Sequence, residues 1–141
     1  MDWIAELQNI NYIAVAVATI ASYVLGFTWY HWAVFGEAWA NALGITKEEA
    51  DNTEDLGSVF IMSLISGLIK TVCLALLMAT IKISGVFGGA FFGAVVAMVF
   101  IFTSLAYYNG FARTSSKLTL INSVHSIVEL TLIGAIVGAL Q

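Results

Sequence analysis

Four long apolar runs constrain this chain more than any other feature of its sequence. They cover residues 10–35, 56–83, 86–109 and 118–140, and polar residues separate them. A helix that crosses a bilayer needs about 20 mostly apolar residues, and each run is long enough. Of the 141 residues, 60% are hydrophobic and 10% are charged, whereas soluble domains are roughly 45–50% apolar and about 25% charged. The sequence predicts an all-α, polytopic membrane protein in which residues 1–141 form one four-helix domain in the lipid bilayer.

Charge and cysteine content exclude several other classes. The net charge of −4 argues against nucleic acid as a partner, because nucleic acid selects basic patches. Cys73 is the single cysteine, so no internal disulfide forms, and no zinc-type spacing occurs. The start, Met1-Asp2-Trp3, has no basic region, and we expect no cleaved signal peptide. These features lead us to expect no cofactor.

The longest polar segment, residues 36–55, joins the first two runs. Within it, Glu37–Leu43 predicts a short interfacial helix that the following glycine ends. Thr46 and Glu49 have the spacing of a capping box, which predicts a second short helix through about Asp55. We interpret its acidic residues as a solvated helix face, with a cation-attracting mouth as the alternative.

The connections between the runs define two sides of the membrane. Loops 36–55 and 110–117 lie on one side, called side A, and both termini and the turn at Ser84 lie on the other, called side B. Basic loop residues favour the cytoplasm. Side A carries more of them than side B, namely Lys47, Arg113 and Lys117 against Lys82. The sequence therefore predicts a multi-pass protein of the cell (inner or plasma) membrane with both termini on the non-cytoplasmic side.

Small residues recur about four positions apart along every run. In lipid, helices associate through close packing, which small residues permit. We predict tight packing towards side B, a vestibule open to side A, and a homo-oligomer that uses spare small-residue faces. The glycines assigned to helix packing are Gly26, Gly67, Gly85, Gly89, Gly93, Gly134 and Gly138.

Polar residues interrupt the last apolar run. Asn122, His125 and Glu129 stand at i, i+3 and i+7, so they share one helix face. Counted from side A, Glu129 lies about 18 Å deep and Lys70 of the second run about 20 Å deep. Two intramembrane charges at matching depth predict a Lys70–Glu129 ion pair.

Aromatic and polar residues gather where the first and third runs reach side A. Trp29, Tyr30 and His31 stand towards the end of the first run, and Tyr107 and Asn109 end the third. Amphipathic rings settle at the depth of the lipid headgroups. We interpret these residues as vestibule or interface residues.

Three interpretations of the polar residues remain open. The Lys70–Glu129 pair fixes helix register in a structural or accessory subunit, or it forms part of a pathway for a proton, ion or small solute. The third is a membrane metal or haem protein, in which His125 and Glu129 would bind a metal with His31. Our hypothesis is a small ion- or solute-translocating protein, proton-coupled in one version. No catalytic residue is assigned, and we do not expect an enzyme.

Several motifs resemble a known family. The chain is similar to the DUF1761 family, which comprises small four-helix membrane proteins of unknown function found mainly in bacteria. His31-Trp32 depart from its pattern, in which small residues or proline follow the Trp-Tyr pair. The resemblance implies fold and location, and it brings no activity with it. The matching residues are Asn11-Tyr12 with the run to Gly26, Trp29-Tyr30, Phe35-Gly36-Glu37-Ala38-Trp39, Leu43-Gly44-Ile45 and Leu120-Ile121-Asn122.

Overall fold

The structure of the protein, a computed structural model, describes residues 3–54 and 56–141. The sequence-based expectations for Met1, Asp2 and Asp55 lie outside these residues. The described residues form helices and turns, with no strand among them. In chain order the helices are α1 (Trp3–Asn9), α2 (Tyr12–Trp29), η1 (Trp32–Gly36), α3 (Glu37–Leu43), α4 (Lys47–Asp51), α5 (Gly57–Ile81), α6 (Val86–Val96), η2 (Ala97–Phe102), α7 (Thr103–Phe111) and α8 (Ser116–Leu140).

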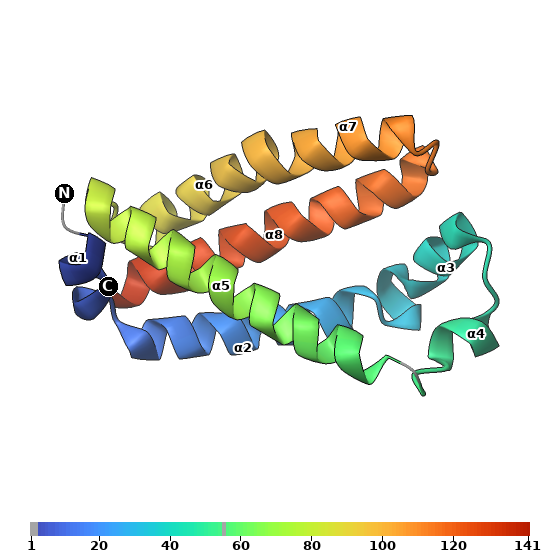
Figure 1. The fold of residues 1–141 in the computed structure, drawn as a ribbon, viewed down its shortest axis with the longest axis horizontal. Helices are drawn as coiled ribbons and strands as arrows, with labels where there is room; N and C mark the ends of the chain where they lie inside the picture. Colours follow the sequence, from blue (N-terminus) through green and yellow to red (C-terminus); the bar gives the residue numbers. More distant parts are fainter. Residues whose placement is uncertain (1–2, 55) are drawn as a thin grey trace.

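Four of these segments are long and apolar enough to cross a membrane: α2, α5, the continuous rod of α6, η2 and α7, and α8. This confirms the predicted all-α, polytopic membrane fold. In Figure 1 α1 and the C-terminal end of α8 lie at one end of the molecule, while α3, α4 and the turn between α7 and α8 lie at the other. The first end is side B and the second is side A.

The first span begins at Tyr12, after the cap residue Asn11, and ends earlier than expected. Asn11 caps α2, since its Oδ1 accepts hydrogen bonds from the backbone N–H groups of Ile13 and Ala14. The expected end at residue 35 is wrong, because α2 ends at Trp29. His31 is extended and caps η1, a short π-helical turn, so the chain changes direction there.

The first loop contains the two short helices that its caps predict. Gly44 ends α3 in the left-handed conformation, with φ of 77°. Thr46 and Glu49 form the predicted capping box of α4. This second helix ends at Asp51 rather than near residue 55, because Asn52 is already extended (φ −76°, ψ 110°).

Helices α6 and α8 meet backbone to backbone. A Cβ atom added at Gly89 would lie 1.9 Å from the carbonyl oxygen of Gly134, and one added at Gly93 would lie 1.9 Å from that of Leu130. At the end of this contact, the Gly85 N–H donates a 2.6 Å hydrogen bond to the Gly138 carbonyl oxygen. Only residues without a Cβ allow this approach, so α6 and α8 form one rigid pair.

The buried apolar side chains gather in the side B half of the bundle. Towards side A, α5 diverges from the rod of α6, η2 and α7, as both figures show. The bundle is therefore closed towards the termini and more open towards α3 and α4. The core cluster consists of Ile10, Val15, Ala18, Leu74, Ala75, Met78, Ile133 and Val137.

Replacing Gly89 by alanine should destabilise the protein by at least about 3 kcal/mol, since the new Cβ would meet the Gly134 carbonyl and overpack the contact. Unfolding by sodium dodecyl sulfate, followed by circular dichroism, measures the change. Gly57→Ala is the control, because Gly57 is also helical and an added Cβ there meets no atom within 4 Å. Equal stability of the two variants would contradict the close α6–α8 contact.

Candidate functional site

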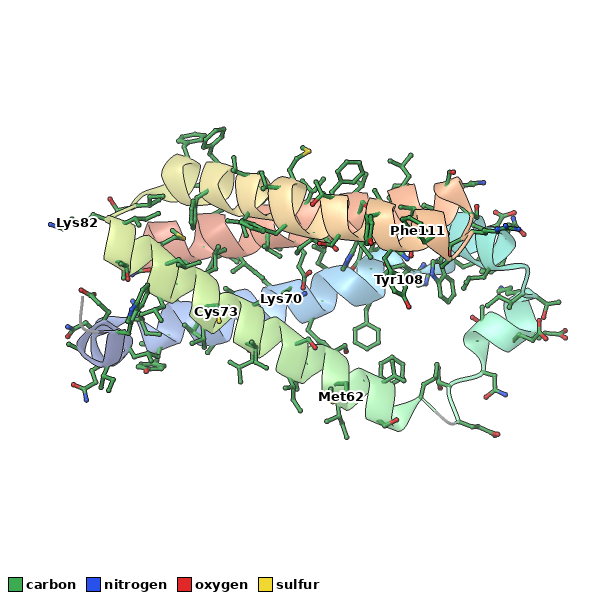
Figure 2. All side chains as sticks on the ribbon, turned by 45° about the horizontal axis from the view of Figure 1, so that its top comes forward. Met62, Lys70, Cys73, Lys82, Tyr108 and Phe111 are labelled. Carbon is green, nitrogen blue, oxygen red and sulfur yellow. The ribbon has the colours of Figure 1, made fainter. Side chains whose placement is uncertain are left out.

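A buried ion pair lies at mid-length of the bundle. Lys70 Nζ on α5 lies 2.6 Å from both Oε1 and Oε2 of Glu129 on α8. The side chain of Glu129 is 6% exposed and that of Lys70 is 34% exposed. Figure 2 shows Lys70 between Lys82 at one end of the molecule and Phe111 near the other. The pair forms within one chain, and each charge neutralises the other in an apolar setting.

Ser22 of α2 is the third member of this polar centre. Its Oγ donates a 2.6 Å hydrogen bond to Glu129 Oε1. An added Cβ at Gly67 of α5 would lie 3.6 Å from the same Oγ, so the glycine lets α5 lie close to the serine. Helices α2, α5 and α8 therefore converge on one carboxylate. The sequence showed Ser22 only as one of the small residues of α2.

The polar face of α8 continues towards side A through His125 and Asn122. The Tyr30 hydroxyl donates a 2.8 Å hydrogen bond to Asn122 Oδ1. The His125 ring lies between two aromatic rings, with centroids 5.7 Å from Trp29 and 5.2 Å from Tyr30. His125 Nε2 is buried and has no hydrogen-bond partner in the part of the chain that the structure describes. The end of α2 thus covers this face of α8.

A pocket of about 470 Å³ extends from this face towards the first loop. Ser22, Gly26 and His125 line it on α2 and α8, and Ala50 and Thr53 line it on the first loop. Ser22 lies about 12 Å deeper than Tyr30 along the helix, so the pocket reaches into the bundle. Its further walls are largely aromatic, with the rings of Tyr23, Phe27, Tyr30, Trp39 and Phe60.

Sequence reasoning assigned no role to Tyr23, Phe27 or Phe60. Tyr23 and Phe27 are four residues apart on α2 and share one helix face, with ring centroids 5.0 Å apart. Phe27 stacks on Phe60 of α5 at 5.7 Å. The i, i+4 spacing could have predicted the contact between Tyr23 and Phe27 from the sequence. The contact of Phe27 with Phe60 could not be predicted, because it depends on how α2 and α5 pack together.

Of the residues predicted as vestibule or interface residues, Tyr30 lines this pocket, whereas His31, Tyr107 and Asn109 do not. His31 is exposed, and its Nδ1 accepts a 3.2 Å hydrogen bond from the Ala33 N–H. Tyr107 is 70% exposed on α7, and Asn109 donates a hydrogen bond to Thr119 on α8. Their depth along the helices predicted that these residues lie at side A. Tyr107 and Asn109 belong to α7, which packs on a face of α8 other than the one that lines the pocket.

The metal interpretation fails on geometry. Among residues 3–54 and 56–141, no group of three histidine, cysteine, aspartate or glutamate side chains is arranged to hold a metal ion. His31 is not brought together with His125 and Glu129, and both oxygens of Glu129 are already bound to Lys70. The potential metal-ligating side chains of the described residues therefore do not form a metal site.

Four membrane-length helices around a buried ion pair define a multi-pass α-helical membrane protein. The chain matches a family described as protein of unknown function (DUF1761) over residues 13–138, and it belongs to that family. The predicted family is thus confirmed, and the match includes the ion pair and the α2, α5 and α8 parts of the pocket. Comparisons with curated proteins and with solved structures give no match.

A double-mutant cycle should detect the ion pair. Lys70→Met alone and Glu129→Leu alone should each destabilise the protein by about 3 kcal/mol, because each leaves a charge unpaired in the bundle. The double variant should recover most of that loss. Detergent unfolding measures all four proteins. If the double variant is no more stable than either single variant, the pair does not contribute as described.

Proposed function

We propose that this protein translocates a small ion or solute across the bilayer, and that protonation of Glu129 is coupled to this movement. One observation carries the proposal: the pocket reaches Ser22, whose hydroxyl donates a hydrogen bond to Glu129. A solute in the pocket would lie one side chain away from an intramembrane carboxylate. Ionisable residues within membrane spans commonly mark the path of an ion or a proton.

The ion pair joins two parts of the bundle that pack differently. Helices α6 and α8 are in backbone contact through their glycines, whereas α5 is held to α8 across the membrane interior by Lys70. Protonation of Glu129 would remove the charge that attracts Lys70 and would free α5 to move against the rigid pair. The titratable groups that act electrostatically on Glu129 are Lys70, His125 and Tyr30.

The uneven packing of the bundle supports alternating access. The pocket is reached from the side of the first loop, while the apolar core closes the side B half. A transporter needs one conformation open to each side. In this proposal the present arrangement is the conformation open to side A, and α5 is the moving part.

A structural or accessory membrane subunit without chemistry is the second candidate. The observation that favours it is the complete pairing of Glu129, which is bound by Lys70 and Ser22 within one chain. In such a protein the pair would only fix the register of α5 against α8. Substitutions at Glu129 would then change stability, and there would be no transport to lose.

The assembly and its orientation belong to the same proposal. We place the protein in the cell membrane as a homo-oligomer with both termini on the non-cytoplasmic side. The partial exposure of the Lys70 side chain and the excess of basic loop residues on side A support this arrangement. The oligomeric state can be measured by light scattering in detergent, and a monomer would contradict the proposed homo-oligomer.

The orientation can be measured with reporter fusions at the C-terminus, and a cytoplasmic C-terminus would contradict the proposed orientation.

Proteoliposomes loaded with a pH-sensitive dye test the transport proposal. A pH gradient is imposed while sodium, potassium, tetraethylammonium, chloride or phosphate is presented in turn. The wild-type protein should show proton flux that depends on one of these solutes. Glu129→Gln should abolish the flux, because the amide cannot take up a proton, and Ser22→Ala should slow it.

Glu6→Gln is the control, because Glu6 lies on α1 at side B, away from the pocket. It should transport like the wild-type protein. Equal flux in the wild-type and Glu129→Gln proteins would contradict the proposed role of Glu129. Absence of flux in every protein, with all of them folded, would favour the structural alternative.

A further inference from the structure

We infer that the pocket binds a lipophilic organic cation, such as a quaternary ammonium or phosphonium compound. This inference names the substrate class of the proposed transport function and rests on it for its biological meaning. The binding itself can be true or false whether or not the protein transports. Three properties of the pocket lead to it: the rings of its walls, the charge at its mouth and the carboxylate behind its inner end.

The walls present aromatic rings from three parts of the fold. Phe27 of α2 and Phe60 of α5 stack at 5.7 Å, and Trp39 of α3 packs edge-on against Tyr30 at 5.6 Å. A cation within about 6 Å of a ring face is attracted by the ring's electrons. The volume of about 470 Å³ falls in the range that holds drug-sized ligands. The walls therefore suit a bulky apolar body that carries a delocalised or shielded positive charge.

The loop segment beside the mouth of the pocket is acidic. Ala50 and Thr53 line the pocket, and acidic residues stand on both sides of them in the sequence. Hydrogen bonds from the backbone N–H and hydroxyl of Thr46 hold the pKa of Glu49 below its usual range, so this carboxylate stays ionised at neutral pH. The acidic residues of this segment within the described chain are Glu48, Glu49, Asp51 and Glu54.

One basic side chain, that of Lys47, lies in this acidic segment and offsets only part of its negative charge. No lysine or arginine is among the described residues that line the pocket. Lys47, the basic residue of the segment, lies over the ring of Trp32 with its Nζ 5.5 Å from the centroid. An excess of acidic groups near a cleft with apolar walls attracts the opposite charge into the cleft. The same excess would repel an anion of equal shape.

A carboxylate lies behind the inner end, one side chain beyond the pocket wall. Ser22 lines the pocket, and its hydroxyl donates a hydrogen bond to Glu129 Oε1. Lys70 holds both oxygens of the same carboxylate. A cation at the inner end would therefore compete with Lys70 for the charge of Glu129. This competition would couple binding to the state of the ion pair.

Tetraphenylphosphonium and tetraphenylborate test the inference, because they share one shape and differ in the sign of their charge. Binding of each to the purified, detergent-solubilised protein is measured by equilibrium dialysis against protein-free micelles. The wild-type protein should bind tetraphenylphosphonium saturably and should not bind tetraphenylborate saturably. Saturable binding of the borate with equal or higher affinity, or no saturable binding of the phosphonium, would overturn the inference.

Variants locate the binding. Trp39→Leu or Phe60→Leu should weaken phosphonium binding about 5-fold, the loss expected for one cation–π contact. Phe111→Leu is the matched control, because Phe111 is 81% exposed on α7 and does not line the pocket. Affinities of both pocket variants equal to that of this control would overturn the assignment to the pocket.

Charge at the mouth is tested separately. The double variant Asp51→Asn with Glu54→Gln should weaken phosphonium binding at low salt, and added salt should reduce the difference. Glu6→Gln at side B is the control and should bind like the wild-type protein. Unchanged affinity of the double variant at low salt would overturn the role of the acidic mouth.

The binding and flux experiments separate the two proposals. Phosphonium binding without solute-dependent proton flux would support this pocket and contradict transport. Flux with another solute and no phosphonium binding would support transport and contradict the cation as its substrate.

Discussion

The Lys70–Glu129 ion pair is the interaction on which the rest of this structure depends. Two charges within apolar helices are costly unless they meet, because neither lipid nor apolar side chains replace water around them. Their contact fixes α5 against α8, and the Ser22 hydroxyl adds α2 to the same carboxylate. The pocket exists beside this point, since its inner end is formed by the helices that the carboxylate holds together.

A second constraint gives the bundle its two unlike halves. The glycines of α6 and α8 bring two backbones into contact, and apolar side chains fill the side B half around them. Towards side A the aromatic residues of α2, α3 and α5 are too bulky for such contact and leave a pocket between them. Rigidity on one side and an aromatic cavity on the other are what a protein with alternating access would need, and the proposed cation site uses both.

Much of the fold could be predicted from local sequence. Run lengths identified the four spans, and the capping box of Thr46 and Glu49 marked the start of a helix. The end of α2 was not predictable, because His31 breaks the helix inside an apolar stretch that hydropathy reads as continuous. Of the site, the ion pair followed from depth along the helices. Ser22 and Phe60 did not, because each gains its role from a partner on another helix.

By itself, the sequence determined which segments are long and apolar enough to cross the membrane, which loops share a side of the bundle and how deep each charge lies along its helix. These properties follow from length, hydropathy and helical rise, which are local. Only the tertiary structure decided which helices stand beside each other and how each is rotated about its axis. Because of this rotation, α7 with Tyr107 and Asn109 packs against a face of α8 that does not line the pocket. The same rotation turns Ser22 towards Glu129 and the aromatic residues of α2 towards the pocket. The rotation of each helix depends on close packing between whole helices, so it cannot be predicted from the sequence of any single segment.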